Sequence, residues 1–134
     1  MQDLKEFLNI IVKKEKLYDL CVYLKNNKDT SFDYMFCQSG IDWEEYLEVI
    51  YHLKSTKHNH EIVIRTRVPD KENANLDSVY NVWKTADFHE REIYDLLGIK
   101  FNHHPDLRRI FLDEDWEGFP LRKDYKDDIN IVEL

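Results

Sequence analysis

The sequence predicts an α+β protein with two N-terminal helices packed on a mainly antiparallel sheet of three to four strands. A capped helix and an extended, irregular C-terminal segment follow. Three observations support this class. Apolar residues recur at helical spacing near the N-terminus, they alternate with polar residues between positions 32 and 68, and helix start and stop residues flank positions 85–98. We expect one α+β domain over residues 1–101, with residues 102–134 as a segment for partner contact rather than a separate domain.

Two amphipathic segments open the chain. Asp3 and Glu6 have the spacing of a helix-capping pair. The apolar side chains that follow fall on one helical stripe, made of Leu4, Phe7, Leu8 and Ile11. A second stripe, over residues 15–25, is made of Leu17, Leu20, Cys21 and Leu24. We therefore expect two helices before the polar break at residues 26–29.

Alternating segments predict the sheet. Aromatic residues alternate with other residues from Phe32 to Phe36, and Gly40 begins an expected turn. Residues 47–53 and 62–68 alternate in the same way and are long enough to pair as an antiparallel hairpin, which Pro69 ends. Residues 70–77 form a polar linker, and residues 78–83 could add a fourth strand.

Residues 85–98 form the best-defined local element. Asp87 is the expected N-cap, and Glu90 is the expected third residue of a capping box. Gly98 stands where a helix needs a left-handed residue after its last turn. The expected buried face consists of Phe88, Ile93, Leu96 and Leu97. Residues 99–101 can form a short strand after this helix.

Composition and charge exclude several classes of function. The formal net charge of -8 and the pI of about 5.2 disfavour a nucleic-acid binder, because phosphate contact needs a basic face. The apolar runs are far shorter than the ~20 residues that cross a bilayer. The N-terminus lacks the basic start and apolar run of a signal peptide. We expect residence in the cytoplasm and a membrane link only through partners.

The residue types also argue against bound cofactors. The two cysteines, Cys21 and Cys37, are isolated, whereas an iron–sulfur cluster or a structural zinc site usually needs four ligands. The six histidines lack helical ligand spacing, and three glycines cannot build a phosphate-binding loop. We therefore expect no catalytic residue, cofactor or metal in this chain. We expect the histidines to be solvated or hydrogen-bonded.

Three stretches of the sequence resemble one known family. Residues 90–99 (Glu-Arg-Glu-Ile-Tyr-Asp-Leu-Leu-Gly-Ile), 104–110 (His-Pro-Asp-Leu-Arg-Arg-Ile) and 117–125 (Glu-Gly-Phe-Pro-Leu-Arg-Lys-Asp-Tyr) closely resemble the C subunit of NADH:quinone oxidoreductase. This is the 30-kilodalton subunit of respiratory complex I. A weaker likeness covers the earlier strands from about residue 32. His103 stands where glycine is usual, and Phe119 where histidine is usual, which leaves the roles of both side chains open.

The resemblance implies a non-catalytic structural subunit of the peripheral arm, beside the quinone-site subunit and the terminal-cluster subunit. Such a complex passes electrons from NADH through FMN and iron–sulfur clusters, held by partner subunits, to a quinone (ubiquinone or menaquinone), coupled to proton translocation. The chain would then be an enzyme only as part of this translocase, peripheral on the cytoplasmic face of the bacterial inner (plasma) membrane. Two alternatives are the equivalent subunit of a membrane-bound nickel–iron hydrogenase and a free-standing protein-binding module.

The same region supplies the expected partner interface. Arginine forks favour bidentate pairing with carboxylates across an interface. The expected interface residues are Glu90, Arg91, Asp95, His104, Pro105, Arg108, Arg109, Trp116, Pro120, Leu121, Arg122, Lys123 and Asp124. We predict that replacing Arg108 or Arg122 by alanine weakens assembly and leaves the isolated domain folded.

Overall fold

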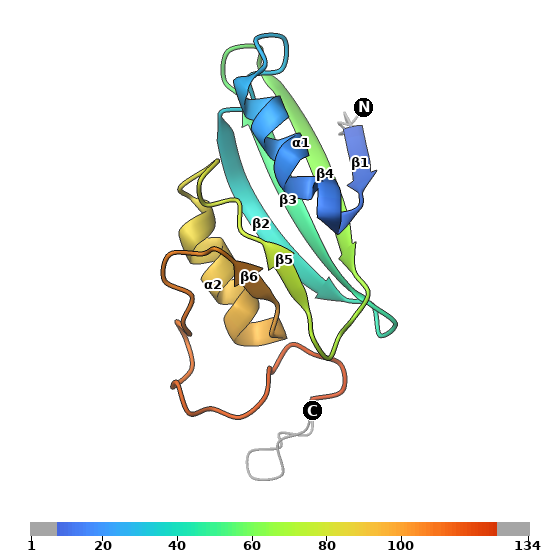
Figure 1. Cartoon of the computed structure of the whole chain (residues 1–134), viewed down its shortest axis with the longest axis vertical. Helices are drawn as coiled ribbons and strands as arrows, with labels where there is room; N and C mark the ends of the chain where they lie inside the picture. The colour runs from blue at the N-terminus through green and yellow to red at the C-terminus, as the bar shows by residue number, and fades with distance from the viewer. Residues whose placement is uncertain (1–7, 126–134) are drawn as a thin grey trace, which may run out of the picture.

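The structure, a computed structural model, describes residues 8–125. It has the α+β architecture that the sequence predicts, with two helices and a mainly antiparallel four-stranded sheet (Figure 1). In chain order the elements are β1 (Leu8–Val12), α1 (Lys14–Asn26), β2 (Tyr34–Asp42), β3 (Leu47–Ser55), β4 (His60–Val68), β5 (Asn75–Asp77), α2 (Ala86–Leu97) and β6 (Lys100–Asn102).

A four-stranded sheet forms the base of the fold, in the order β1-β4-β3-β2. Neighbours among β2, β3 and β4 are antiparallel, whereas β1 lies parallel to β4. The predicted hairpin is confirmed as β3 and β4, in which Leu47 pairs with Val68 and Leu53 with Ile62. Side-chain alternation sets this register, because a slip of one residue would turn every core side chain outward.

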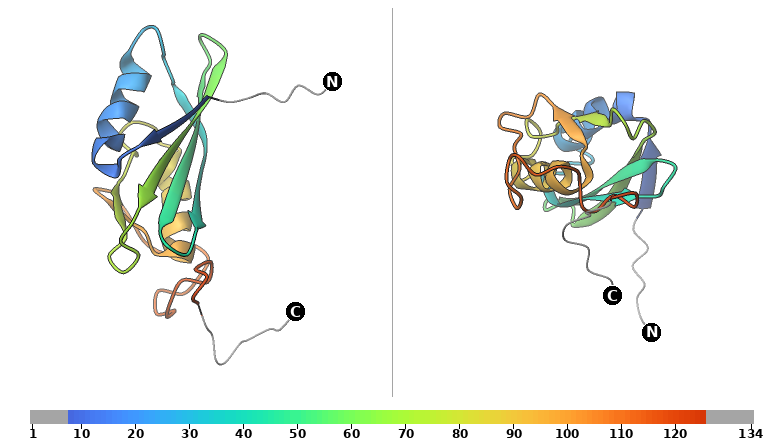
Figure 2. Two further views of the ribbon diagram at one scale, coloured as in Figure 1. Left: turned by 90° about the vertical axis from the view of Figure 1, so that its right-hand side faces the viewer. Right: turned by 90° about the horizontal axis from the view of Figure 1, so that it is seen from below.

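The two helices and the short β5–β6 pair cover one face of the sheet (Figures 1 and 2). Helix α1 packs against β4 and β5, and α2 packs against β2. At the second contact, Gly40 lets the helix come close, because a Cβ there would lie 2.5 Å from Leu97 and 3.2 Å from Ile93. Fully buried side chains in the core between these layers include Leu17, Met35, Leu47, Tyr51, Leu53 and Ile64.

The first predicted helix is wrong over the part that the structure describes. Leu8–Val12 is strand β1, paired with residues 62–66 of β4. Its last three residues are β-branched and suit a pleated sheet better than a helix. The expected helix start at Asp3 and Glu6 lies outside the described residues. The second predicted helix is confirmed as α1, so the described N-terminal region holds one helix rather than two.

Strand β2 is confirmed but extends further than expected. It continues through Gly40, where we expected a turn, and ends at Asp42. Met35 is fully buried, whereas its neighbours Tyr34 and Phe36 are 45% and 37% exposed. The aromatic alternation therefore marks the solvent-facing side of this strand and not its core side.

The fourth strand expected at residues 78–83 does not form. Those residues make turns, with the N–H of Val82 donating to the carbonyl of Val79. A three-residue strand, β5, forms just before them, inside the segment expected to be a polar linker. It pairs in parallel with β6, which confirms a short strand after α2. The turns bring Ser78 and Val79 against α2.

Helix α2 is confirmed with a different start. It follows Thr85, whose side chain makes no capping hydrogen bond to the helix. Asp87 therefore lies inside the first turn rather than at the N-cap. The C-terminal prediction is confirmed, because Gly98 ends the helix in a left-handed conformation with φ of 77°.

The buried face of α2 is only partly apolar. Ile93 and Leu97 are buried as expected, but Phe88 is 51% exposed. Two acids, Glu90 and Asp95, are fully buried in its place. An ionisable group rarely lies inside a protein without partners, so these carboxylates direct attention to what surrounds them.

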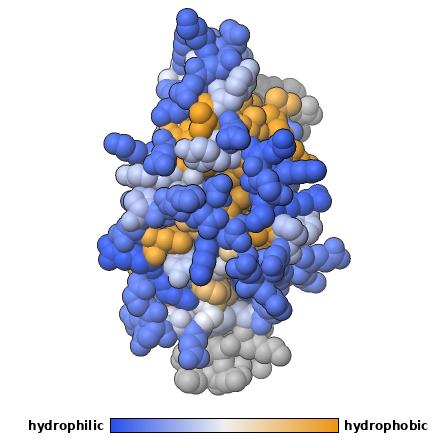
Figure 3. Space-filling model, viewed as in Figure 1, coloured by the Kyte–Doolittle hydropathy of each residue, from blue (hydrophilic) through white to orange (hydrophobic). Residues whose placement is uncertain are grey.

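The C-terminal segment is irregular, as predicted, since residues 103–125 contain no helix or strand. It passes beside α2 and then crosses below the domain (Figures 1 and 2). Hydrophilic side chains cover most of the face seen in Figure 3, with apolar patches over α1 and β1. Over residues 8–125, neither helix has the length and apolar character that crossing a membrane requires.

Candidate interface on helix α2 and the C-terminal segment

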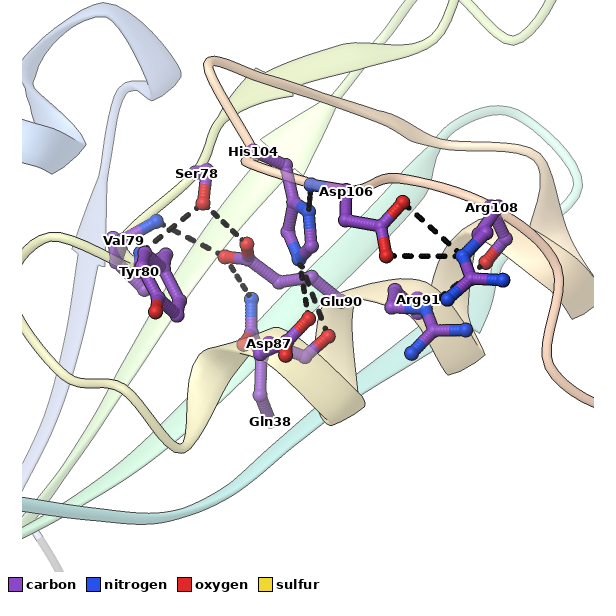
Figure 4. Close-up of polar contacts among 10 residues, drawn as sticks. All are labelled: Gln38, Ser78, Val79, Tyr80, Asp87, Glu90, Arg91, His104, Asp106 and Arg108. Atoms are coloured by element: carbon purple, nitrogen blue, oxygen red, sulfur yellow. Dashed lines mark hydrogen bonds and ion pairs between the residues drawn. The ribbon is translucent and has the colours of Figure 1, made fainter.

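Glu90 is the centre of a buried polar network that joins α2 to the turn after β5 (Figure 4). The hydroxyl of Ser78 donates to its Oε1 at 2.5 Å, and the N–H of Val79 donates to its Oε2 at 3.0 Å. The side-chain amide of Gln38, on β2, donates to Oε2 at 3.1 Å. The donors come from two separate segments, β2 and the turn after β5, so Glu90 fastens both of them to α2.

Burial shifts the titration of this network. Burial raises the pKa of Glu90 to about 7. The hydrogen bonds from Ser78, Val79 and Gln38 lower this pKa, and the charge of nearby Asp87 raises it, but burial has the largest effect. Burial, followed by the charge of Glu90, raises the pKa of the Cys21 thiol to about 12. The same two causes raise the pKa of Tyr51 well above its ordinary value. A proton on Glu90 is therefore held more tightly than on a solvated carboxyl group.

Asp95 organises the start of the C-terminal segment in a comparable way. Its Oδ2 accepts the N–H groups of Ile110, Phe111 and Leu112 at 3.2, 2.7 and 3.2 Å. Its Oδ1 lies 3.2 Å from Nη1 of Arg109, and both side chains are buried. Three backbone donors and a guanidinium therefore compensate one buried carboxylate.

His104 fixes the first turn of the segment to α2 (Figure 4). Its side chain is fully buried, and its Nε2 lies 3.2 Å from Oδ1 of Asp87. The N–H of Asp106 donates to Nδ1 at 3.0 Å, so Nδ1 carries no proton and Nε2 is the ring donor. His103, just before it, has a positive φ of 68°, a conformation that favours glycine, which is the residue that the family resemblance implies at this position.

Phe119 closes the segment against the end of α2. A Cβ on Gly98 would lie 2.5 Å from its ring, so glycine leaves the space that the ring fills. Arg109 and Arg122 approach the same ring, with guanidinium carbons 4.9 and 5.6 Å from its centroid. The aromatic face attracts both cations, which gives Phe119 a packing role that the sequence left open.

Arg122 and Lys123 tie the far end of the segment to the domain. Arg122 donates from Nε to the carbonyl of Leu97 at 2.6 Å and from Nη1 to the carbonyl of Lys71 at 2.7 Å. The N–H of Lys123 donates to Oδ2 of Asp42 at 2.9 Å. Burial alone would raise the pKa of Asp42, but this bond and those from Lys71 outweigh it and lower the pKa to about 2.

The predicted interface residues thus fall into two groups. Glu90, Asp95 and the side chains of His104 and Arg109 are buried and bond within the chain, so we reassign them to the fold. Because Arg122 also bonds within the chain, we no longer expect Arg122→Ala to leave the domain intact. We retain the interface prediction for the residues whose side chains are exposed, which are Pro105, Arg108, Leu121, Lys123 and Asp124. We also retain it for the half-buried residues Arg91, Trp116 and Pro120.

Sequence reasoning missed one exposed feature and several buried partners. Phe88 and Phe111 are 51% and 58% exposed, and their rings meet edge to face with centroids 6.3 Å apart. Phe88 was expected in the core because it has helical spacing, and Phe111 lies in a run without periodicity. Gln38 and Ser78 gave no local signal, because they meet Glu90 only through the fold.

The described residues contain no group of three or more His, Cys, Asp or Glu side chains that could hold a metal ion. The main features of this region are a C-terminal segment held against α2 and an exposed surface beside them. The family model "Respiratory-chain NADH dehydrogenase, 30 Kd subunit" matches residues 10–129. The chain belongs to this family. The match begins inside β1. It takes in the rest of the four-stranded sheet, both helices and the described C-terminal segment.

Relatives cover most of the chain. It is 39% identical over 132 residues to the NADH-quinone oxidoreductase C subunit of Geobacter sulfurreducens, an alignment that covers 92% of this chain and 78% of the relative. It is 44% identical over 111 residues to the C subunit of Chlorobium phaeobacteroides, covering 81% of this chain and 66% of the relative. It is 45% identical over 126 residues to the C/D subunit of Phocaeicola vulgatus, covering 93% of this chain and 24% of the relative. The chain therefore spans less than two thirds of the last two relatives.

A solved structure shares the fold of this member of the 30-kilodalton subunit family. It is described as "Structure of the membrane-bound sulfane sulfur reductase (MBS), an archaeal respiratory membrane complex". The TM-score is 0.78 with 24% sequence identity, and the alignment covers 96% of this chain and 77% of the other. At this identity the similarity establishes the fold alone.

Proposed function

We propose that this chain is a non-catalytic structural subunit in the peripheral arm of an NADH:quinone oxidoreductase of the complex I type. The complex would carry electrons from NADH through FMN and iron–sulfur clusters, all held by partner subunits, to quinone, coupled to proton translocation. Membership of the 30-kilodalton subunit family is the observation that supports this proposal most strongly. The chain acts as an enzyme only as part of that assembly.

The partners in this proposal are the quinone-site subunit and the terminal-cluster subunit of the same complex. The Phocaeicola vulgatus relative, which carries the double designation C/D, matches this chain over only 24% of its length. In that protein the counterpart of this chain is covalently joined to a larger remainder, which supports a permanent hetero-oligomer. The chain would reach the cytoplasmic face of the bacterial inner (plasma) membrane only through such partners.

The mechanism is organisational. Asp95 and Arg122 hold the C-terminal segment against α2, and Glu90 fastens α2 to β2 and to the turn after β5. These contacts use buried charges and many hydrogen bonds, which fix geometry more than they add stability. A rigid brace of this kind can keep neighbouring redox subunits in register, on which electron transfer and quinone access depend.

The equivalent subunit of a nickel–iron hydrogenase is the main alternative. A chain in the structure of the archaeal sulfane sulfur reductase complex shares this fold, so we do not infer the electron donor from the architecture. The relatives that are 39–45% identical are named NADH-quinone oxidoreductase subunits, which favours NADH. A free-standing binding module is the third possibility.

Purification of the tagged chain from native membranes tests the proposal. In mild detergent we expect subunits bearing FMN and iron–sulfur clusters to co-purify, with NADH:quinone reductase activity in the same fractions. The chain purified alone should show no flavin or cluster absorbance. Recovery only as a soluble monomer would support the binding module, and co-purification with a nickel-containing protein without FMN would support the hydrogenase alternative.

A further inference from the structure

The exposed aromatic pair lies beside two arginines. Phe88 is on α2, and Arg91 follows it by three residues, on the same side of the helix. The Nε of Arg91 donates to the carbonyl of Arg108 at 3.2 Å, which places the chain just before Phe111 against the helix. We call these four residues, Phe88, Arg91, Arg108 and Phe111, the aromatic–arginine surface.

The chain holds this surface in place before any partner arrives. The N–H of Phe111 donates to the buried carboxylate of Asp95 at 2.7 Å. Arg108 is fixed on its other side by Asp106, which accepts from its Nε at 2.9 Å (Figure 4). Groups that are already ordered lose less conformational entropy when they bind, so pre-organised anchors favour association.

The composition of the surface matches that of a protein-binding anchor. Aromatic residues and arginine are enriched at the energetically dominant positions of interfaces. Phe88 and Phe111 are each roughly half exposed, and moving the exposed apolar surface out of water would release free energy. A partner with an apolar pocket would recover that free energy.

The charge of the aromatic–arginine surface indicates which kind of partner it can bind. The Arg108 side chain is 61% exposed, and both arginine contacts described above use Nε, on a chain whose net charge is -8. A second copy of the chain, packed about a two-fold axis, would bring this surface onto itself and oppose guanidinium groups of like charge. Carboxylates on a different protein would instead pair with them.

We infer that the aromatic–arginine surface docks into an apolar pocket, bordered by carboxylates, on a neighbouring subunit of the same complex. This inference rests on the proposed function and names the part of the chain that makes the contact. It assigns the anchoring role to Phe88 and Phe111, with Arg91 and Arg108 setting orientation.

The first test removes the aromatic rings. The double variant Phe88→Ser/Phe111→Ser, tagged and expressed in place of the native chain, should recover at least tenfold less of the redox subunits from membranes. Tyr34→Ser/Phe36→Ser is the matched control, because those rings are also exposed but lie on β2, and it should recover wild-type amounts. Equal recovery by both variants would overturn the inference. Failure of the wild-type chain itself to co-purify would overturn the proposed function instead.

The second test does not depend on the stability of the serine variants. Photo-crosslinking p-benzoylphenylalanine placed at position 111 of the full chain should link it to one redox subunit, identified by mass spectrometry. The cross-linked peptide should carry apolar and acidic residues, and the same group at position 34 should not form that product. A cross-link to a second copy of this chain, to lipid alone or to no protein would contradict the docking site.

Discussion

Asp95 on α2 and Arg109 in the C-terminal segment form a buried ion pair, with Oδ1 and Nη1 3.2 Å apart. The same carboxylate accepts the backbone N–H groups of residues 110–112. One side chain therefore controls both the charge balance and the course of the segment beside the helix.

Replacement of Asp95 by asparagine should loosen the segment. The guanidinium of Arg109 would lose its counter-charge while remaining buried, which costs on the order of 3 kcal/mol in the free energy of unfolding. Urea unfolding measures that loss, and hydrogen exchange should show faster exchange of amides 110–112. Asp106→Asn is the control, because its pair with Arg108 is exposed and should change stability by no more than about 0.5 kcal/mol. Equal stability of the two variants would argue against the bracing role of Asp95.

The raised pKa of Glu90 predicts a pH-dependent stability. Folding raises the pKa of this group from 4.5 to about 7, so its protonated form is favoured in the folded state. The free energy of unfolding should therefore be greater at pH 4.5 and fall by roughly 2–3 kcal/mol as the pH rises to 7. Denaturant unfolding across this range measures the slope.

Two comparisons isolate the contribution of Glu90. Glu90→Gln should flatten the profile between pH 4.5 and 7, whereas Glu92→Gln, on a half-buried residue of the same helix, should keep the wild-type slope. The lowered pKa of Asp42 acts in another range, since its stabilisation is lost only as the pH falls from about 4 through 2. An unchanged slope in Glu90→Gln would assign the pH dependence to other groups.

Gly98 and Phe119 should behave as a coupled pair. Gly98→Ala places a Cβ 2.5 Å from the ring of Phe119 on a backbone with φ of 77°, so we expect a loss of about 2 kcal/mol or more. Part of that cost is steric and should vanish in a Phe119→Ala background, where only the backbone strain remains. A double-mutant cycle by urea unfolding measures the coupling, and strict additivity of the two changes would show that the contact carries no energy.

His103→Gly should leave the fold at least as stable as the wild type. The φ of 68° at His103 strains a residue with a side chain by about 1–2 kcal/mol, and glycine removes that strain. The greater freedom of glycine in the unfolded chain offsets about 0.5–1 kcal/mol of the gain. Thermal unfolding should show a small rise in Tm. A clear loss of stability would mean that the imidazole makes contacts that outweigh the strain.

The local periodicity of the sequence predicted the elements that local forces decide. The stripe through Leu17, Cys21 and Leu24 gave helix α1, and alternation gave the β3–β4 hairpin. Gly98 marked the end of α2 because few other residues accept its backbone conformation. The class of the protein and the irregular character of its C-terminal segment followed from the same patterns.

The errors arose where distant contacts decide the structure. Residues 8–12 have helical spacing but form β1, because the distant strand β4 provides an edge for parallel pairing with residues 62–66. Glu90 has the spacing of a capping box but turns inward, because Ser78 and Gln38 supply donors in the core. Phe88 has the spacing of a core residue but lies beside Phe111 on the surface. Such partners come together only after the chain has folded.

Electron microscopy of the complex purified through this chain tests the central claim most directly. We predict density for this chain between redox subunits, with Phe88 and Phe111 at a contact and every flavin and iron–sulfur cluster bound elsewhere. A redox centre held by residues 8–125, or a purified oxidoreductase that lacks this chain and keeps full quinone reductase activity, would contradict the account.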